Sequence, residues 1–295
     1  MRDALRSSHW LKRKSPPTST FSVPDINEIT GTMRTIAVMN QKGGSAKTTT
    51  TVNLAAALAI LGKKVLVVDL DPQANATTWL GAANGKGVFE VLTGEKKLLD
   101  IVQASTSAGV DAAPGSAWLA GAERTLAGEV GAELVFRKAL ERLPEKWDVI
   151  LVDCPPAIGL LSISALAACG EVIVPCEART MALSGLAGLV QTLERVKDRL
   201  NPKLVLSGVV ACRVDGRTKL SEEVVATLRD RFGDDVFRAV VRENVRLAEA
   251  PSFAKSIFDY DPKSTGAKDY TAVAKELLAR AGSKHKQRAK RSRLR

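Results

Sequence analysis

A glycine-rich segment between an apolar run and a helical pattern carries the residue types that hold phosphate groups. The run Ile36–Asn40 is followed by Gln-Lys-Gly-Gly-Ser-Ala-Lys-Thr-Thr at positions 41–49. Gly43 and Gly44 let the backbone turn with its N–H groups facing inward, and the N-terminus of the next helix adds partial positive charge. We therefore predict that this loop cradles the phosphates of a nucleotide.

The polar side chains of the loop suit the same chemistry. Lys47 is placed to hold the β and γ phosphates, and the Thr48 hydroxyl to hold a magnesium ion. The pattern GxxxxGK(S/T) is not matched, because Gln41 and Ala46 stand where it requires glycine. A positive φ at Ala46 would cost about 1 kcal/mol of strain, whereas a near-helical backbone would only have to keep the methyl clear of the phosphates.

Two other apolar runs end in carboxylates. Asp69 lies in Val65–Leu70 with Asp71 just beyond it, and Val149–Asp153 ends in an aspartate. Carboxylates at the C-terminal ends of parallel strands lie beside the phosphate crevice, where they can position water or magnesium. We predict that Asp153 holds magnesium through water and that Asp69 supports the loop and the water shell of the metal. Capping of a helix near Ala74 is an alternative role for Asp71.

The elements that must position these residues follow an alternating pattern. Short apolar runs, expected to be buried strands, alternate with stretches of helical period, as in a parallel sheet with crossover helices. The strands are expected at 36–40, 65–70, 149–153, 172–175, 204–211 and 236–241. Helices are expected after the loop, with Gly62 as left-handed C-terminal cap, and at 116–143, 160–169, 182–200, 219–232 and 266–282. The fold class is therefore α/β, a doubly wound, mostly parallel sheet.

Charge divides the 295-residue chain into a body and two ends. The net charge is +11, but residues 284–295 hold seven basic residues and no acid, and residues 1–33 hold five basic residues against three acids. We predict a disordered basic extension at 1–33, one domain at 34–283 that contains the phosphate loop, and a basic C-terminal tail at 284–295. The tail is either a solubilising end or a salt-sensitive handle for nucleic acid.

Several classes of protein are excluded by the sequence. The longest apolar stretch, Cys154–Gly170, contains two prolines and is shorter than a membrane span. The N-terminus lacks the apolar run and cleavage site of a secretory signal. The four cysteines have no CxxC or CxxxxC spacing, which argues against disulfides, zinc or a cysteine-held cluster. We expect a cytoplasmic protein without a membrane anchor.

The loop and its carboxylates resemble those of the ParA/MinD family of P-loop ATPases. Residues 42–49 are similar to the deviant Walker A box KGGxxGK(S/T), and 69–73 and 149–156 to the family segments DxDPQ and hhhhDxPP. The resemblance implies that Lys42 reaches the phosphates of a partner subunit in a nucleotide-sandwich dimer, and that Asp71 orients the attacking water. The expected catalytic residues are thus Lys42, Lys47 and Asp71, and the magnesium residues Thr48, Asp69 and Asp153. The expected nucleotide-binding residues are Lys42, Gly43, Gly44, Ser45, Ala46, Lys47, Thr48, Thr49 and Asn244.

The C-terminal half resembles the partition branch of that family. The segment Cys212–Lys219 is similar to its DxRTxL turn, and Asn244–Ser252 matches its NVRLxEAPS stretch. The resemblance implies that Arg217 and Arg246 bind DNA without reading its sequence, the alternative being solvated arginines or ion pairs with neighbours such as Glu243 and Glu249. It also implies that Asn244 helps to enclose adenine, although Arg-Glu replaces the Pro-Arg that usually precedes this asparagine.

The resemblance implies an ATP-dependent DNA partition protein. Two subunits holding ATP and Mg²⁺ would form a homodimer that binds double-stranded DNA on the nucleoid, and a ParB-like partner would stimulate slow hydrolysis and release. Two alternatives remain open. One is a scaffold that holds nucleotide without hydrolysing it, suggested by Ala46. The other is a MinD-like positioning ATPase for another cargo, although only Leu294 in the tail suits the apolar stripe of a membrane helix.

Overall fold

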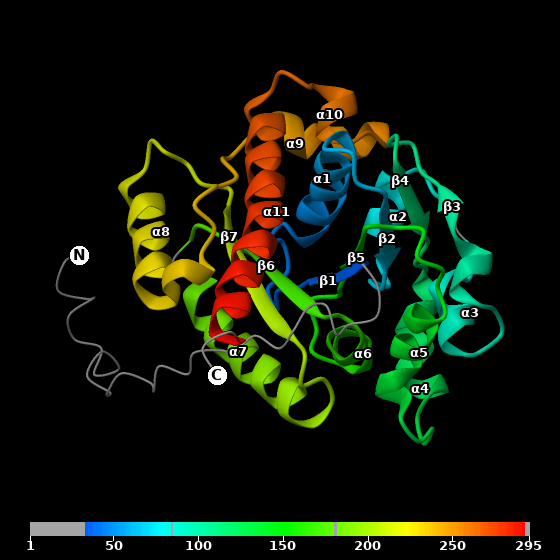
Figure 1. Cartoon of the computed structure of the whole chain (residues 1–295). Coiled ribbons are helices and arrows are strands. Elements are labelled where there is room, and N and C mark those ends of the chain that lie inside the picture. The colour runs from blue at the N-terminus through cyan, green and yellow to red at the C-terminus, as the bar shows by residue number, and fades with distance from the viewer. Residues whose placement is uncertain (1–32, 84, 180–181, 293–295) are drawn as a thin grey trace.

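The computed structural model describes residues 33–83, 85–179 and 182–292, with side chains left out at 182–184 and 281–292. The expected extension at 1–33 therefore lies outside the described residues except for Met33. The described chain forms one seven-stranded sheet with helices on both faces (Figure 1). The predicted fold class, a doubly wound and mostly parallel α/β sheet, is confirmed.

The strand order places the first strand near the middle of the sheet. The order is β3-β4-β2-β5-β1-β6-β7, and β3 alone runs antiparallel to its neighbour among these strands. The strands span Arg34–Val38 (β1), Val65–Asp69 (β2), Gln103–Ala104 (β3), Val110–Ala113 (β4), Val149–Asp153 (β5), Glu171–Glu177 (β6) and Val205–Cys212 (β7). Because β1 lies between β5 and β6, the loop that follows it has a strand end on each side.

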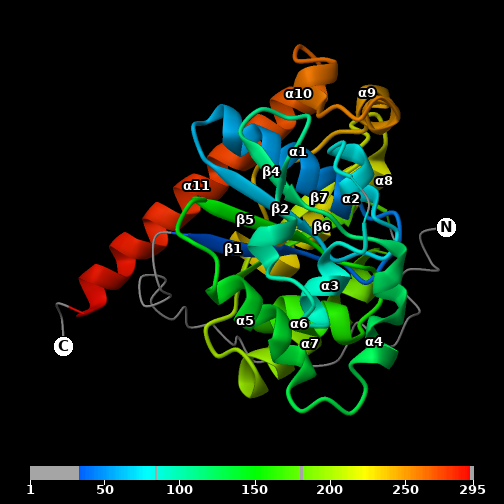
Figure 2. The same ribbon diagram turned by 90° about the vertical axis from the view of Figure 1, so that its right-hand side faces the viewer.

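The helices divide between the two faces of the sheet. They span Lys47–Ile60 (α1), Asn75–Trp79 (α2), Val88–Leu92 (α3), Ala122–Thr125 (α4), Val135–Glu141 (α5), Leu160–Ala168 (α6), Ala182–Arg199 (α7), Lys219–Phe232 (α8), Val245–Glu249 (α9), Ile257–Tyr260 (α10) and Thr265–Ser292 (α11). α1 and α11 cover one face, and α5, α6 and α7 cover the other (Figure 2).

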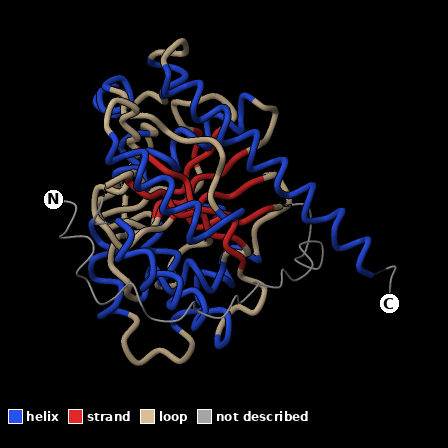
Figure 3. Tube along the Cα trace, turned by 90° about the vertical axis from the view of Figure 1, so that its left-hand side faces the viewer, coloured by secondary structure: helices blue, strands red, loops and turns tan. Residues whose placement is uncertain are grey.

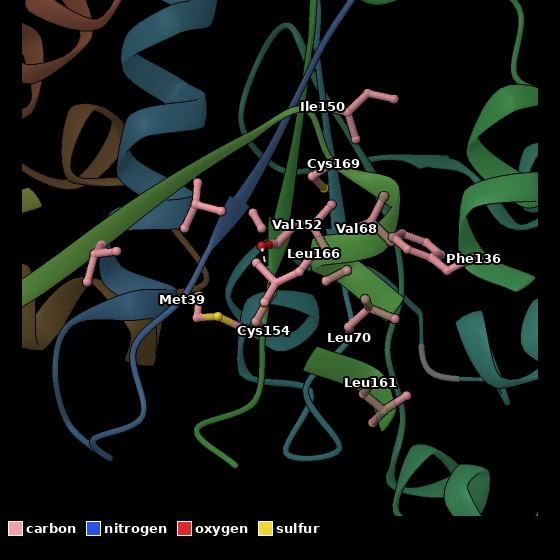
Figure 4. Close-up of a cluster of buried hydrophobic side chains, with 14 of the residues drawn as sticks. Met39, Val68, Leu70, Phe136, Ile150, Val152, Cys154, Leu161, Leu166 and Cys169 are labelled. Atoms are coloured by element: carbon pink, nitrogen blue, oxygen red, sulfur yellow. Dashed lines mark hydrogen bonds between the residues drawn. The ribbon is translucent and has the colours of Figure 1, made fainter. Parts of the chain in front are cut away.

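Alternate residues of the central strands pack into two apolar cores. In β5, Val149 and Leu151 face the core beneath α1 and α11, while Ile150 and Val152 face the core beneath α5 and α6. Figure 4 shows part of the second core, where Phe136 lies beside the strand residues. Burial on both faces explains why these strands are continuous apolar runs without alternation, as is usual in parallel sheets.

The first helix ends as the sequence predicts. Gly62 adopts φ 82°, and the N–H of Lys63 donates to the Leu58 carbonyl across the helix terminus. This left-handed glycine satisfies carbonyl groups that the helix end leaves free. The expected cap is confirmed.

The expected helix at 116–143 is wrong as a continuous element. It is divided into a 3₁₀ turn at Ala117–Gly121, α4, a second 3₁₀ turn at Ala132–Leu134, and α5. Gly128 and Gly131 lie between α4 and α5 with φ 89° and 76°, values that a helix does not allow. The apolar period continues across the break, and the two glycines interrupt the helix.

The expected strand at 236–241 is also wrong. The segment runs beside β7, and the N–H groups of Phe237 and Val241 donate to carbonyls of β7, but the pairing amounts to isolated bridges at Val236 and at Arg242, just past the segment. Between them, the N–H groups of Arg238 and Ala239 donate to the carboxylate of Glu276 in α11, at 3.0 and 2.9 Å. Because those donors face a side chain of α11, they are not available for a ladder with β7.

Two further differences concern the edge of the sheet and the last helix. The short strands β3 and β4 were not expected, since Gln103–Ala104 and Val110–Ala113 lack a long apolar run. The last helix continues to Ser292, beyond the expected end at 282, and its C-terminal part extends away from the body (Figure 3). The side chains of the basic tail at 284–295 lie outside the described residues.

The contacts of Glu276 predict a specific loss of stability. Glu276→Ala removes the acceptor of two backbone N–H groups and an ion pair with Arg280. We expect the free energy of unfolding to fall by about 1–3 kcal/mol, because two backbone N–H groups lose a charged acceptor. Urea unfolding measures this change. The exposed Glu223→Ala on α8 is the control and should differ from the parent by less than about 0.5 kcal/mol; equal loss in both variants would contradict the assignment.

Candidate functional site

The predicted chemical residues meet at the C-terminal edge of the parallel strands. Asp69 of β2 and Asp153 of β5 are register partners, and Val38 at the end of β1 is the partner of Asp153 on its other side. A cleft of about 600 Å³ opens here, bounded by the loop after β1, by Asp71 and by residues 241–248. A crevice beyond the carboxyl ends of parallel strands is the usual ligand site of such folds.

The loop after β1 is held from the β6 side. Asn40 donates through Nδ2 to the Pro175 carbonyl at 2.7 Å, and its Oδ1 accepts the N–H of Lys42 at 3.0 Å. Gly44 has φ 72°, a conformation that favours glycine. A methyl group built on Gly43 or Gly44 would meet no atom of the chain within 4 Å. The space over both glycines is therefore open, as a loop that receives phosphate requires.

Ala46 adopts the left-handed conformation that the sequence left undecided. Its φ and ψ are 67° and 27°, and it stands at the N-cap of α1 without a side-chain cap. A residue other than glycine pays about 1 kcal/mol or more for this conformation. The strain expected of a positive φ at this position is therefore present. The methyl group lines the cleft without closing it.

Lys47 lies almost buried at the first turn of α1. Its Nζ donates to the backbone carbonyl of Lys42 at 3.2 Å, across the mouth of the loop. Burial lowers the pKa of Lys47, while the carboxyls of Asp153 and Asp71 oppose that shift. An ammonium group with a single carbonyl partner, facing the open loop, is suited to bind phosphate oxygens.

Asp153 joins the end of β5 to the first turn of α1. The hydroxyl of Thr48 donates to one oxygen of its carboxyl at 2.8 Å, and the hydroxyl of Thr51 to the other at 2.9 Å. Burial raises the pKa of Asp153 to about 8, and the nearby carboxyls of Asp69 and Asp71 add to the shift. A divalent cation placed beside Thr48 would offset this cost of charge. The predicted magnesium pair, Thr48 and Asp153, is thus together in the fold.

Asp69 has its carboxyl occupied by the chain itself. One oxygen accepts the N–H and hydroxyl of Thr77, at 2.8 and 2.7 Å, and the other accepts the N–H of Asp71. Burial raises the pKa of Asp69 to about 6. The arrangement supports the loop after β2, as predicted. A direct place for Asp69 in the water shell of a metal stays a prediction.

Asp71 faces the cleft and does not cap the neighbouring helix. Its Oδ1 accepts the N–H of Gln73 at 3.0 Å, while α2 begins after Ala74 without a side-chain cap. Only 6% of Asp71 is exposed, and it lines the same cleft as Lys47 and Thr48. The position suits a group that orients water near a terminal phosphate.

The opposite end of the cleft is formed by the segment before α9. Asn244 caps α9 by accepting the N–H of Arg246 at 2.8 Å, and its Nδ2 donates to the hydroxyl of Thr265. Arg242, which replaces the usual proline, is tied to Asp269 of α11 by its backbone N–H and its guanidinium. Both residues line the cleft, but the side chain of Asn244 is already engaged. Its contact with adenine stays a prediction.

Lys42 does not point toward its own Asp153. Its ammonium lies 3.5 Å from Glu177 at the end of β6, and 40% of its side chain is exposed. The same carboxylate is approached by Arg179 and Arg213 at 3.3 and 3.0 Å. Glu177 could not be singled out from the sequence, because Lys42 and Arg213 lie in segments far from it in the chain.

The two arginines predicted to bind DNA are exposed and ion-paired. Arg217 has 88% of its side chain exposed and makes a two-pronged contact with Asp215, whose pKa these hydrogen bonds lower to about 2. Arg246 contacts Glu249 at 2.9 Å and Asp261 at 3.6 Å. The alternative of ion pairs with neighbours, named for Glu249, is therefore present in the fold, and DNA binding stays a prediction.

The site fits a nucleotide with magnesium. Within residues 33–83, 85–179 and 182–292, no group of three or more His, Cys, Asp or Glu side chains is arranged to hold a metal by itself. A metal would therefore rely on Thr48, on Asp153 through water, and on phosphate oxygens. Thr51 was missed by sequence reasoning, although its position one helical turn after Thr48 places both hydroxyls on one side of α1.

The comparisons with known proteins agree with this geometry. A family model described as an AAA domain matches residues 33–206. The chromosome-partitioning ATPase Soj of Thermus thermophilus is 48% identical over 84% of this chain and 96% of its own, and the sporulation initiation inhibitor protein Soj of Bacillus subtilis is 43% identical over 83% and 98%. The chain belongs to the Soj/ParA family of partitioning ATPases. The predicted family and the predicted ATP hydrolase are confirmed by this membership.

A solved structure adds a nucleotide to the comparison. Cobyrinic acid a,c-diamide synthase from Mycobacterium smegmatis, with bound ADP and magnesium, matches with a TM-score of 0.75 and 35% identity over 85% of this chain and 96% of its own. The predicted ATP and Mg²⁺ are consistent with that complex. In the part of the chain that the structure describes, no helix is long and apolar enough to cross a membrane.

The raised pKa of Asp153 predicts a pH-dependent stability of the nucleotide-free protein. The folded state holds a proton on this carboxyl up to about pH 8, whereas the unfolded state releases it near 3.8. The contribution of Asp153 is therefore fully present below pH 4 and is lost as pH rises through 8. As pH rises from 5 to 8.5, we expect the free energy of unfolding of Asp153→Asn to rise relative to that of the parent by on the order of 2 kcal/mol. Urea unfolding at each pH measures this. The exposed Asp198→Asn is the control, and parallel pH curves for parent and Asp153→Asn would contradict the prediction.

Proposed function

We propose that this protein is an ATP-dependent DNA partition ATPase in which ATP joins two identical subunits. The support is the position of Lys42, whose ammonium lies beside Glu177 instead of the magnesium pair of its own subunit and whose side chain is 40% exposed. An exposed lysine beside the phosphate loop can neutralise charge on a nucleotide that faces it from a second subunit. Lys47, Thr48 and Asp153 would hold ATP and Mg²⁺ within each subunit.

Asp71 would orient the water that attacks the terminal phosphate. Its carboxylate lines the same cleft as the phosphate loop, so a water beside it can be aligned with a terminal phosphate. The bound magnesium would supply neutralisation of the phosphate charge. Lys47, which has only a carbonyl partner in the loop, would bind the phosphate oxygens that gain charge during transfer.

The proposed DNA contacts are the exposed Arg217 and Arg246. Both guanidinium groups can exchange a carboxylate for a phosphate, since the two acceptors have the same forked geometry. Their present ion pairs lie at the surface, where such pairs contribute about 0–1 kcal/mol. The exchange therefore costs little free energy. The affinity for DNA rises when a dimer aligns four arginines along one duplex. We further propose a nucleoid location and a ParB-like partner that stimulates hydrolysis.

Gel retardation on DNA of unrelated sequence tests the proposal. With ATP and Mg²⁺ we expect retention that ADP or the absence of nucleotide does not give. Lys42→Ala should lose it because the dimer fails, and Arg217→Ala should weaken it by about tenfold through the loss of phosphate contacts. Lys96→Ala, which removes an exposed lysine paired with Glu90, is the control and should bind like the parent. Retention without nucleotide would contradict the proposal and indicate that the basic tail alone binds DNA.

A second candidate function is favoured by Ala46. The left-handed alanine at the N-cap of α1 suits a DNA-bound scaffold that holds nucleotide without hydrolysing it, if its strain shifts the loop from the geometry that hydrolysis needs. Phosphate release with DNA present separates the two functions. If the protein is a partition ATPase, we expect phosphate release at a rate that Asp71→Ala reduces at least about tenfold, because the water loses its orienting group. Equal background rates in the parent and Asp71→Ala would support the scaffold.

A further inference from the structure

Glu177 is a buried carboxylate on which three cations from separate segments converge. It is the last residue of β6, its side chain is 6% exposed, and it lies within 3.5 Å of Lys42, 3.3 Å of Arg179 and 3.0 Å of Arg213. β6 is the strand on the side of β1 opposite Asp153. The phosphate loop thus has one buried acid on each side, Asp153 beside Thr48 and Glu177 beside Lys42.

The ion pairs of Glu177 leave one of its two carboxyl oxygens without a well-aligned hydrogen bond. Among the described residues, its buried Oε1 receives no hydrogen bond of good geometry, although Arg179 and Arg213 lie close to it. A buried carboxylate in this condition attracts nearby cations strongly, because neither water nor a full set of N–H donors offsets its charge. Lys42 lies 3.5 Å from the other oxygen, Oε2, a distance typical of an ion pair held by charge.

The position of Glu177 conflicts with a second role for Lys42. Glu177 and phosphates across an interface compete for the same ammonium, because a carboxylate 3.5 Å away already neutralises part of its charge. Movement of Lys42 toward a partner's nucleotide then weakens the Lys42–Glu177 contact in both subunits. Since this contact favours the separated subunit, it opposes the dimer by its own free energy.

Arg213 connects Glu177 with the end of the cleft formed by the segment before α9. One nitrogen of its guanidinium lies 3.0 Å from Glu177, and the other lies 3.3 Å from Glu243. Arg213 and Glu243 both line the cleft, and Arg213 has φ 51° at the end of β7. By neutralising part of the charge of Glu177, Arg213 weakens the attraction that holds Lys42.

We propose that Glu177 is a positioning residue that holds Lys42 within its own subunit and competes with the phosphates of the partner for that lysine. Arg213 sets the strength of this restraint. The proposal rests on the nucleotide-joined dimer proposed above, whose regulation it specifies. The restraint prevents pairing at low protein or ATP concentration, because the dimer forms only when the phosphates outcompete two buried carboxylates.

Sedimentation velocity in ATP and Mg²⁺ tests the proposal with the full-length chain. Each variant also carries Asp71→Ala, to prevent turnover. Glu177→Gln should lower the dimer dissociation constant by about five- to thirtyfold, because the two Lys42–Glu177 ion pairs, one in each subunit, no longer oppose pairing. Arg213→Gln should raise it, because Glu177 then holds Lys42 more firmly. The affinity of the monomer for a fluorescent ATP analogue is measured in parallel, so that a loss of nucleotide binding is not mistaken for a loss of pairing.

Glu243→Gln is the matched control. It removes a carboxylate that pairs with Arg213 at the same cleft but does not contact Lys42, and it should change the dimer constant by less than about threefold. An unchanged or weaker dimer in Glu177→Gln, with ATP affinity intact, would overturn the role of Glu177 and leave the proposed dimer standing. Absence of a dimer in the Asp71→Ala parent at saturating ATP would overturn the proposed function and this inference together.

Discussion

The site depends on the placement of β1 between two parallel neighbours in register. Because β5 and β6 end at the same edge as β1, the loop after β1 has an acid on each side, Asp153 and Glu177. Thr48 and Lys42, only six positions apart, therefore face opposite acids. A shift of either neighbouring strand by one residue would turn its terminal carboxylate toward the other face of the sheet and separate these pairs.

Burial of Asp69, Asp153 and Glu177 costs free energy, which bound cations can offset. Asp69 and Asp153 are register partners at the strand ends, and burial raises the pKa of each. Hydroxyl groups of Thr48, Thr51 and Thr77 reduce this cost without removing it. A cation brought by a nucleotide would reduce it further. The same principle applies to Glu177, where cations of the chain itself take that place. Ligand binding and subunit pairing thus both act on acids that the fold keeps away from water.

The residues that line the cleft could be predicted from the sequence better than some of the surrounding helices and strands. The phosphate loop, Asp69, Asp71 and Asp153, which the fold brings to one edge of the sheet, could be predicted as neighbours because each belongs to a short local pattern next to an apolar strand; their chemical roles stay predictions. The break at Gly128 and Gly131 and the non-strand at 236–241 were missed, because glycine conformation and the carboxylate of Glu276 override the apolar pattern. Glu177 and Arg213 were missed for another reason: their contact with each other and the contact of Glu177 with Lys42 join residues far apart in the chain, and no local pattern records them.

The central claim is that ATP joins two copies of this chain through Lys42. The most direct measurement is the mass of the Asp71→Ala protein in solution, by sedimentation equilibrium at saturating Mg²⁺ with either ATP or ADP. The account predicts the mass of two 31.5 kDa chains with ATP and of one chain with ADP. A single-chain mass in both nucleotides, with ATP demonstrably bound, would contradict it.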